Sequence, residues 1–177
     1  MDNRQLSYCI GLGSNVGDRE EYLKTALHYL QEKGGKLKDV SSLYATEPWG
    51  NKNLSPFVNM VVVILSELKP MDMLDVCQEI EIRLKRVRIK DEIGYQDRTI
   101  DIDLLLVEDE VWQTKRLVIP HPHLVDRNFV LAPLFEIAPM WIHPENKKTI
   151  EYLHDNCKDE SKVMRIKPPI IQLKTPN

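Results

Sequence analysis

Two aspartates interrupt an otherwise apolar run at residues 99–106, which reads TIDIDLLL. Side chains of a strand point alternately to its two faces, so Asp101 and Asp103 would share one face, about 6.6 Å apart. Their repulsion would be roughly 2–3 kcal/mol at an effective dielectric near 20, and below about 1 kcal/mol in open water. One interpretation is a solvated strand face, although strands are poor in Asp. The other is a carboxylate pair that binds a hard cation such as Mg²⁺, whose charge would turn the repulsion into attraction.

Basic residues stand on both sides of these aspartates. Arg86 and Arg88 precede them and would face the same way in an extended chain. Arg98 stands directly before the TIDIDLLL run, and Arg116 and Arg127 follow it. A solvated run of charge is the ordinary explanation. A guanidinium, however, binds phosphate oxygens in a bidentate manner. Carboxylates for a metal together with arginines for phosphate are the groups that phosphoryl transfer uses, because that reaction depends on positioning and on neutralising charge.

The segment FVNMVVVIL contains a polar residue that its surroundings do not explain. Phe57 and Asn59 would share one face of a strand, and a buried amide must find hydrogen-bond partners. Neighbouring backbone groups could supply these partners. Alternatively, Asn59 could read the donor and acceptor edge of a heterocycle while Phe57 stacks on its plane.

Two further motifs are less specific. GLGSNVG at residues 11–17 has Val16 where a dinucleotide fingerprint needs glycine, and no GKS or GKT follows, so we interpret its glycines as permitting a tight turn between a strand and a helix. In PHPH, His121 and His123 have no third ligand nearby, which argues against zinc. His121 is a candidate phosphate or substrate contact.

The order of predicted elements gives the fold class. Strands are expected near residues 6–15, 36–48, 57–68 and 99–106, with helices near 19–33 and 69–86. This βαββαβ order predicts an α+β protein with a ferredoxin-like core, in which helices back one face of an antiparallel sheet. A short strand near 115–120 and a helical segment near 128–139, broken or restarted at Pro133, extend the core toward the C-terminus. Residues 158–177 are expected to form a loose tail.

Composition limits the function classes. A chain of 177 residues with 42% hydrophobic content fits one domain over residues 1–177, without room for a second full domain. The net charge of −3 does not indicate nucleic-acid binding, and no apolar run approaches the ~20 residues that span a membrane. Cys9, Cys77 and Cys157 form no CxxC pair and are expected to be reduced, so we expect a cytoplasmic protein.

Together, several motifs resemble one enzyme family. They are GLGSNVGDRE, YATEPWG, FVNMVV, RVR, DRTIDIDLLL and IPHPHLVDRNFVLAPLFEIAP, in this order over roughly residues 7–145. They resemble 6-hydroxymethyl-7,8-dihydropterin pyrophosphokinases (HPPK), enzymes of folate synthesis. The resemblance implies transfer of the β,γ-diphosphate of ATP to the hydroxymethyl group of the pterin, with release of AMP and with two Mg²⁺ ions. It leaves the oligomeric state open; we expect a monomer.

The resemblance also implies a role for each matching residue. Asp101 and Asp103 would bind both metal ions, and Arg86 and Arg98 would grip the phosphates. Contacts to ATP are implied for Gln78, Arg88, Arg116, His121 and Arg127. Contacts to the pterin are implied for Thr46, Pro48, Phe57, Asn59 and Phe129.

The chain departs from the family pattern at two places. The family commonly has a tryptophan, a glycine and a proline before the arginine that corresponds to Arg98, whereas this chain reads IGYQDR, so Ile93 and Tyr95 are the candidates to cover the site. Pro122 stands where an aromatic residue is often found. Two alternatives remain at this point: another Mg²⁺-dependent phosphoryl or nucleotidyl transferase, and a pterin-binding module without catalysis.

Overall fold

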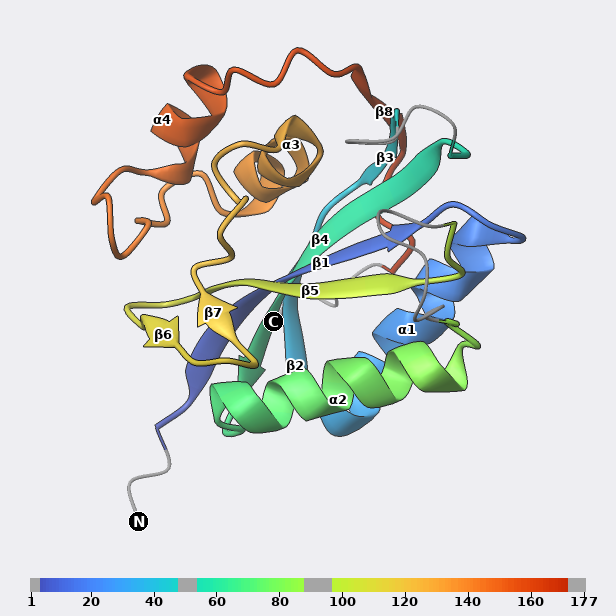
Figure 1. The fold of residues 1–177 in the computed structure, drawn as a ribbon, viewed down its shortest axis with the longest axis horizontal. Helices are drawn as coiled ribbons and strands as arrows, with labels where there is room; N and C mark the ends of the chain where they lie inside the picture. Colours follow the sequence, from blue (N-terminus) through green and yellow to red (C-terminus); the bar gives the residue numbers. More distant parts are fainter. Residues whose placement is uncertain (1–3, 48–53, 88–96, 172–177) are drawn as a thin grey trace, which may run out of the picture.

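The computed structural model describes residues 4–47, 54–87 and 97–171. Figure 1 shows a sheet with helices on both of its faces. The elements are β1 (Leu6–Ser14), α1 (Arg19–Lys33), β2 (Lys36–Val40), β3 (Leu43–Thr46), β4 (Phe57–Ser66), α2 (Pro70–Arg83), β5 (Asp101–Val107), β6 (Trp112–Gln113), β7 (Val118–Ile119), α3 (Asn128–Ile137), α4 (Ile150–Asp155) and β8 (Val163–Lys167). An α+β protein with an antiparallel sheet is therefore confirmed.

The main sheet has the strand order β5-β1-β4-β3-β8, and β2 also pairs with β4. Every pair in it is antiparallel. The single strand expected over residues 36–48 is divided into β2 and β3 at Ser41 and Ser42. The N–H of Ser41 donates to the carbonyl of Val61, and the Ser41 hydroxyl accepts from the N–H of Val61 at 2.9 Å. This side-chain bond replaces a regular ladder bond, which explains the interruption.

The two faces of the sheet bury two separate apolar clusters. One face packs against α1 and α2 through residues such as Ile10, Val62 and Leu104, and the other packs against α3 through Cys9 and Val63. The expectation that the core helices back one face of the sheet is confirmed for α1 and α2, but α3 covers the other face, which the sequence analysis did not predict. The physical reason lies in β4, whose residues are almost all buried, because such a continuous apolar strand needs cover on both sides.

The helix ends follow local chemistry. The Asp18 side chain accepts the N–H of Glu21 at 3.1 Å and caps α1, and Pro70 occupies the first turn of α2, where no N–H is needed. In α3, Pro133 lies inside one continuous helix, so the expected break is absent from Asn128–Ile137. The strand expected near 115–120 is β7, which pairs with β6.

Over residues 158–171 the C-terminal segment is less loose than expected, and residues 172–177 lie outside the described residues. Val163–Lys167 form β8, which pairs with the edge strand β3, as Figure 1 shows. Glu20 in α1 pairs with Lys167 at 2.7 Å. Ile170 and Ile171 pack against the apolar cluster between the sheet and the helices α1 and α2. The prediction was wrong here because an edge strand offers unpaired backbone groups that a mostly polar segment can satisfy.

Two expectations from composition concern membrane-spanning helices and the state of the cysteines. No helix within the described ranges has the length and apolar character needed to cross a membrane. Cys9, Cys77 and Cys157 are free thiols, as expected, and Cys9 and Cys77 are buried.

Candidate active site

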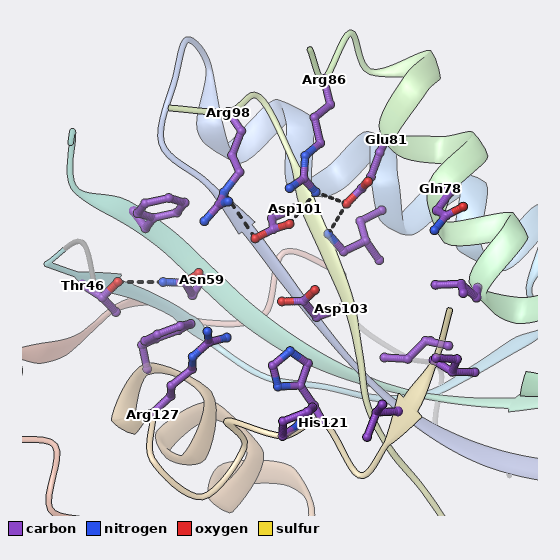
Figure 2. Close-up of a pocket in the computed structure, with 18 of the residues that line it drawn as sticks. Thr46, Asn59, Gln78, Glu81, Arg86, Arg98, Asp101, Asp103, His121 and Arg127 are labelled. Atoms are coloured by element: carbon purple, nitrogen blue, oxygen red, sulfur yellow. Dashed lines mark hydrogen bonds and ion pairs between the residues drawn. The ribbon is translucent and has the colours of Figure 1, made fainter. Parts of the chain in front are cut away.

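One cavity of about 470 Å³ collects the predicted site residues. It opens where β4 begins, between the start of β5, the end of α2 and the segment that leads into α3 (Figure 2). Twelve predicted residues line it: Thr46, Phe57, Asn59, Gln78, Arg86, Arg98, Asp101, Asp103, Arg116, His121, Arg127 and Phe129. Pro48 and Arg88, and the candidate covering residues Ile93 and Tyr95, lie outside the described residues.

The aspartates point from β5 into this cavity. Their neighbours Ile102 and Leu104 face α2 instead, as the alternation of the strand predicts. The Asp101 carboxylate pairs with Arg86 and, at 3.2 Å, with Nε of Arg98. Burial, and then the charge of Asp101, raise the pKa of Asp103 to about 7. Figure 2 shows Asp101 and Asp103 side by side on β5, with both arginines above Asp101.

Glu81 completes this arrangement and was missed by the sequence analysis. This residue is only 4% exposed, and its side chain accepts the N–H of Ile102 at 2.9 Å and pairs with Arg86 (Figure 2). It therefore satisfies the outer edge of β5 and holds the Arg86 guanidinium beside Asp101. The signal was present in the sequence: Glu81 follows Cys77 by four residues, so it lies on the buried stripe of α2, where a charge needs a partner.

Asn15 fixes the backbone beside Arg98. This 4% exposed residue accepts the N–H of Arg98 at 2.7 Å and donates to the carbonyl of Ser55 at 3.2 Å and to the Asp97 carboxylate. It thus ties the end of β1 to the segments before β4 and β5. The sequence analysis did not assign Asn15, although it belongs to the GLGSNVG motif.

The glycines of that motif do two different things. Gly17 has φ +67° and sits in the turn before α1, as the turn interpretation requires. Gly11 and Gly13 instead lie within β1, opposite Asp103 and Asp101 respectively. The turn interpretation is therefore wrong for these two positions.

The aromatic residues and Asn59 lie at the other end of the cavity. Phe57 and Phe129 both line it, with the Arg98 guanidinium 5.2 Å from the Phe57 ring centre and that of Arg127 5.7 Å from the Phe129 ring centre. Nδ2 of Asn59 donates to the Thr46 hydroxyl at 2.7 Å. A side chain, rather than backbone alone, therefore holds the Asn59 amide.

His121 carries a neutral ring into the cavity. Its Nδ1 accepts the N–H of His123 at 3.1 Å, so the ring proton belongs on Nε2. Burial, and then the charge of Arg127, lower the pKa of His121 from its ordinary 6.5 to about 4. The imidazole is thus a hydrogen-bond donor without charge at neutral pH.

The cavity becomes more apolar toward β7. Leu74, Leu117 and Val118 line this part, where Gln78 and Arg116 provide polar groups at its margin. Arg116 is largely exposed and pairs with Asp75. Such a surface suits the flat base of a nucleotide.

The acidic pair fits Mg²⁺ by its chemistry. Among the described residues, no group of three or more His, Cys, Asp and Glu side chains is placed to hold a metal ion. Mg²⁺ commonly uses only one or two carboxylates and takes its other ligands from phosphates and water. The raised pKa of Asp103 reflects a negative charge that the protein compensates incompletely, which a cation would relieve.

Comparison with known proteins gives a consistent family. The family model for 7,8-dihydro-6-hydroxymethylpterin-pyrophosphokinase matches residues 9–139. The chain is 47% identical over 138 residues to a 2-amino-4-hydroxy-6-hydroxymethyldihydropteridine pyrophosphokinase of Porphyromonas gingivalis, covering 77% of this chain and 92% of the relative. It is 43% identical over 130 residues to the Bacillus subtilis enzyme of that name, covering 73% of this chain and 76% of the relative.

Solved structures agree at the level of the fold. The wild-type HPPK-DHPS chain of Plasmodium falciparum superposes with a TM-score of 0.71 at 19% identity, over 86% of this chain and 44% of that chain. The present chain thus spans less than half the length of that relative. From the family match and the sequence relatives, we conclude that this chain belongs to the 7,8-dihydro-6-hydroxymethylpterin-pyrophosphokinase (HPPK) family.

Proposed function

We propose that this protein transfers the β,γ-diphosphate of ATP to the hydroxymethyl group of 6-hydroxymethyl-7,8-dihydropterin and releases AMP, as a step of folate synthesis. The observation that carries this proposal is the order of groups along one cavity: an apolar end, the paired carboxylates with their arginines, and an end with Phe57 and Asn59. In this reaction the hydroxymethyl group loses its proton to solvent and its oxygen bonds to the β-phosphorus, while the bond from that phosphorus to the bridging oxygen of the α-phosphate breaks and AMP leaves.

The acceptor would bind between β4 and α3. Phe57 and Phe129 would cover the two faces of the pterin ring, while Asn59, held by Thr46, would read its donor and acceptor edge. Pro48 is assigned to this subsite by the family resemblance alone. With its edge on Asn59, the pterin would direct its hydroxymethyl group toward Asp101 and Asp103, which line the same cavity.

The phosphates of ATP would lie over β5. Arg86 and Arg98 are positioned to bind their oxygens, and His121 can donate from Nε2 without adding charge. Arg127 lies on the opposite wall, and Arg88 joins this set by resemblance. Two Mg²⁺ ions on Asp101 and Asp103 would neutralise charge on the phosphate oxygens. Gln78 and Arg116 would border the base and ribose of the nucleotide.

The remaining proposals concern the whole chain. We take β1, α1, β2 with β3, β4, α2 and β5 to be a ferredoxin-like core, because the sheet order places β1 and β4 at its centre. A single domain, a monomer and a cytoplasmic location remain our expectations. The free thiols fit the reducing cytoplasm.

Product analysis tests the proposed reaction. Purified protein is incubated with Mg²⁺ and ATP, with and without 6-hydroxymethyl-7,8-dihydropterin, and nucleotides and pterins are measured by mass spectrometry. We expect AMP and a diphosphorylated pterin, formed together and only when the pterin is present. ADP with a monophosphorylated pterin would identify a different phosphoryl transferase. Pterin binding without any product would contradict catalysis.

A further inference from the structure

Gly13 lies at the point where the carboxylates and the acceptor subsite meet. In the sheet register, β1 pairs Gly13 with Asp101 of β5 on one side and with Asn59 of β4 on the other. Residues directly opposite each other in antiparallel strands have their side chains on the same face, with Cβ atoms about 4.5–5.5 Å apart. A small hollow marks this place, and its lining includes Gly13, Asn59, Asp101, Asp103 and Phe129, with Gly11 and Leu105 further along β1 and β5.

Space, and not backbone conformation, requires glycine here. A Cβ placed on Gly13 would lie 2.5 Å from Oδ1 of Asn59 and 3.5 Å from Cδ1 of Phe57. The former separation is shorter than any ordinary contact, so one of the two groups would have to move. Gly13 is not among the residues with positive φ, and its strand conformation is one that alanine also adopts.

The Asn59 amide is held on its other side. Nδ2 donates to the Thr46 hydroxyl at 2.7 Å, and Asn59 is 7% exposed. A Cβ at position 13 would therefore push Oδ1 away from β1 while Thr46 retains Nδ2, so the plane of the amide would rotate. The group that meets the edge of the acceptor would change its direction.

We propose that Gly13 is a positioning residue for the acceptor: its missing side chain leaves room for the Asn59 amide beside β1, in the orientation that meets the edge of the acceptor. This inference rests on the proposed function, because the acceptor is the pterin named there. Gly13 acts through Asn59, so its replacement impairs binding of the acceptor and spares binding of the nucleotide.

Gly11 supplies a matched control two residues earlier on the same face of β1. A Cβ placed there would lie 3.1 Å from Cδ1 of Leu105, an apolar side chain that can rotate. Gly11 pairs with Val61 of β4 and with Asp103 of β5, and not with Asn59. Gly11→Ala therefore adds the same methyl group to the same strand without disturbing the amide.

The experiment compares steady-state kinetics and ATP binding of the wild type, Gly13→Ala and Gly11→Ala. For Gly13→Ala we expect KM for 6-hydroxymethyl-7,8-dihydropterin to rise at least about tenfold, while the Kd for ATP stays within about twofold. For Gly11→Ala we expect both constants within about threefold of the wild type. A normal pterin KM in Gly13→Ala, or equal rises in both variants, would overturn the inference.

A double-mutant cycle with Asn59→Ala identifies the route of the effect. If Gly13 acts through Asn59, adding Gly13→Ala to Asn59→Ala raises the pterin KM no further, whereas independent effects multiply. Multiplying effects would overturn the inference. Should Gly13→Ala alone fail to fold, the double variant must fold, because it lacks the clashing amide; a double variant that also fails would overturn the inference.

Failure of the proposed function gives a different result. In that case the wild type itself forms no AMP and diphosphorylated pterin. If the wild type is active but Asn59→Ala has a normal pterin KM, the assignment of Asn59 is wrong, and the route through it is overturned as well.

Discussion

Three strands, β1, β4 and β5, present one face toward α3, and the two ends of that face differ. At one end Cys9, Val63 and Leu105 pack against Leu131 and Leu134 of α3 in an apolar cluster. At the other end the same strands carry Gly13, Asn59 and Asp101, which line the cavity. The same three strands pair along the whole face; the β1–β5 register shifts between Cys9 and Ile10 at the packed end, and the side chains on the face change from apolar groups there to glycine and polar groups at the open end. The comparison indicates that the packed end supplies the stability of this face, while the groups at the open end are arranged for substrates.

The packed end should govern stability. Leu134 is fully buried in the cluster below α3, and we expect Leu134→Ala to lower the free energy of unfolding by about 2–5 kcal/mol, because it leaves a cavity. Urea denaturation measures this loss. Activity per folded molecule should stay within about twofold of the wild type, since Leu134 does not line the site. A folded variant with much lower activity would break the division between the two ends.

The open end should govern turnover through its buried ion pairs. Glu81→Gln keeps the shape of the side chain and an acceptor for the N–H of Ile102, but removes the charge beside Arg86. We expect kcat/KM for ATP to fall by about 10–100-fold, because Arg86 loses one of its two anchors.

A second glutamate on α2 provides the control. Glu79 pairs with Lys33 and Arg83 on the surface, where ion pairs contribute little. Glu79→Gln should therefore leave kcat/KM within about twofold of the wild type. Equal losses in the two variants would show that any charge change on α2 impairs the enzyme, and would contradict the special role of Glu81.

The smallest predicted effect concerns His121 at the open end. Its pKa in the folded protein, about 4, lies below its ordinary 6.5, so the unfolded chain binds the proton first as the pH falls. The contribution of His121 to the free energy of unfolding is therefore fully present above pH 6.5 and is lost as the pH falls toward 4. Because His121 is only partly buried, we expect its share of the loss between pH 7.5 and 5.0 to be about 1 kcal/mol.

Urea denaturation at these two pH values measures the effect. His121→Asn keeps an acceptor for the N–H of His123 but does not titrate, so its stability should fall less between pH 7.5 and 5.0 than that of the wild type. Identical losses in both proteins would contradict a lowered pKa for His121.

The sequence predicted the features that depend on the alternation of side chains along a strand and on local motifs. The same-face geometry of Asp101 and Asp103, the strands around them and the two long helices all follow from local periodicity. The second helical layer could be inferred from β4, since a strand buried on both faces needs cover on both. The pairing of β8 with β3 could not be inferred, because it depends on a free sheet edge far away in the sequence.

The missed site residues share one property. Glu81, Asn15 and Gly13 are defined by their neighbours in space: Arg86 and Ile102 for Glu81, Arg98 and Ser55 for Asn15, and Asn59 for Gly13. Only the buried charge of Glu81 on its helix left a recognisable signal. Positions of this kind become visible when strands and loops are brought together in three dimensions.

The central claim is that the open end of this face is arranged for catalysis rather than for stability, and Asp103→Asn tests it most directly. The measurement is the free energy of unfolding at pH 7, taken together with turnover on the same sample. Because burial and Asp101 disfavour a charge at position 103, we predict stability equal to or above that of the wild type, with turnover reduced at least about 100-fold. A clear loss of stability, or a rate close to that of the wild type, would contradict the account.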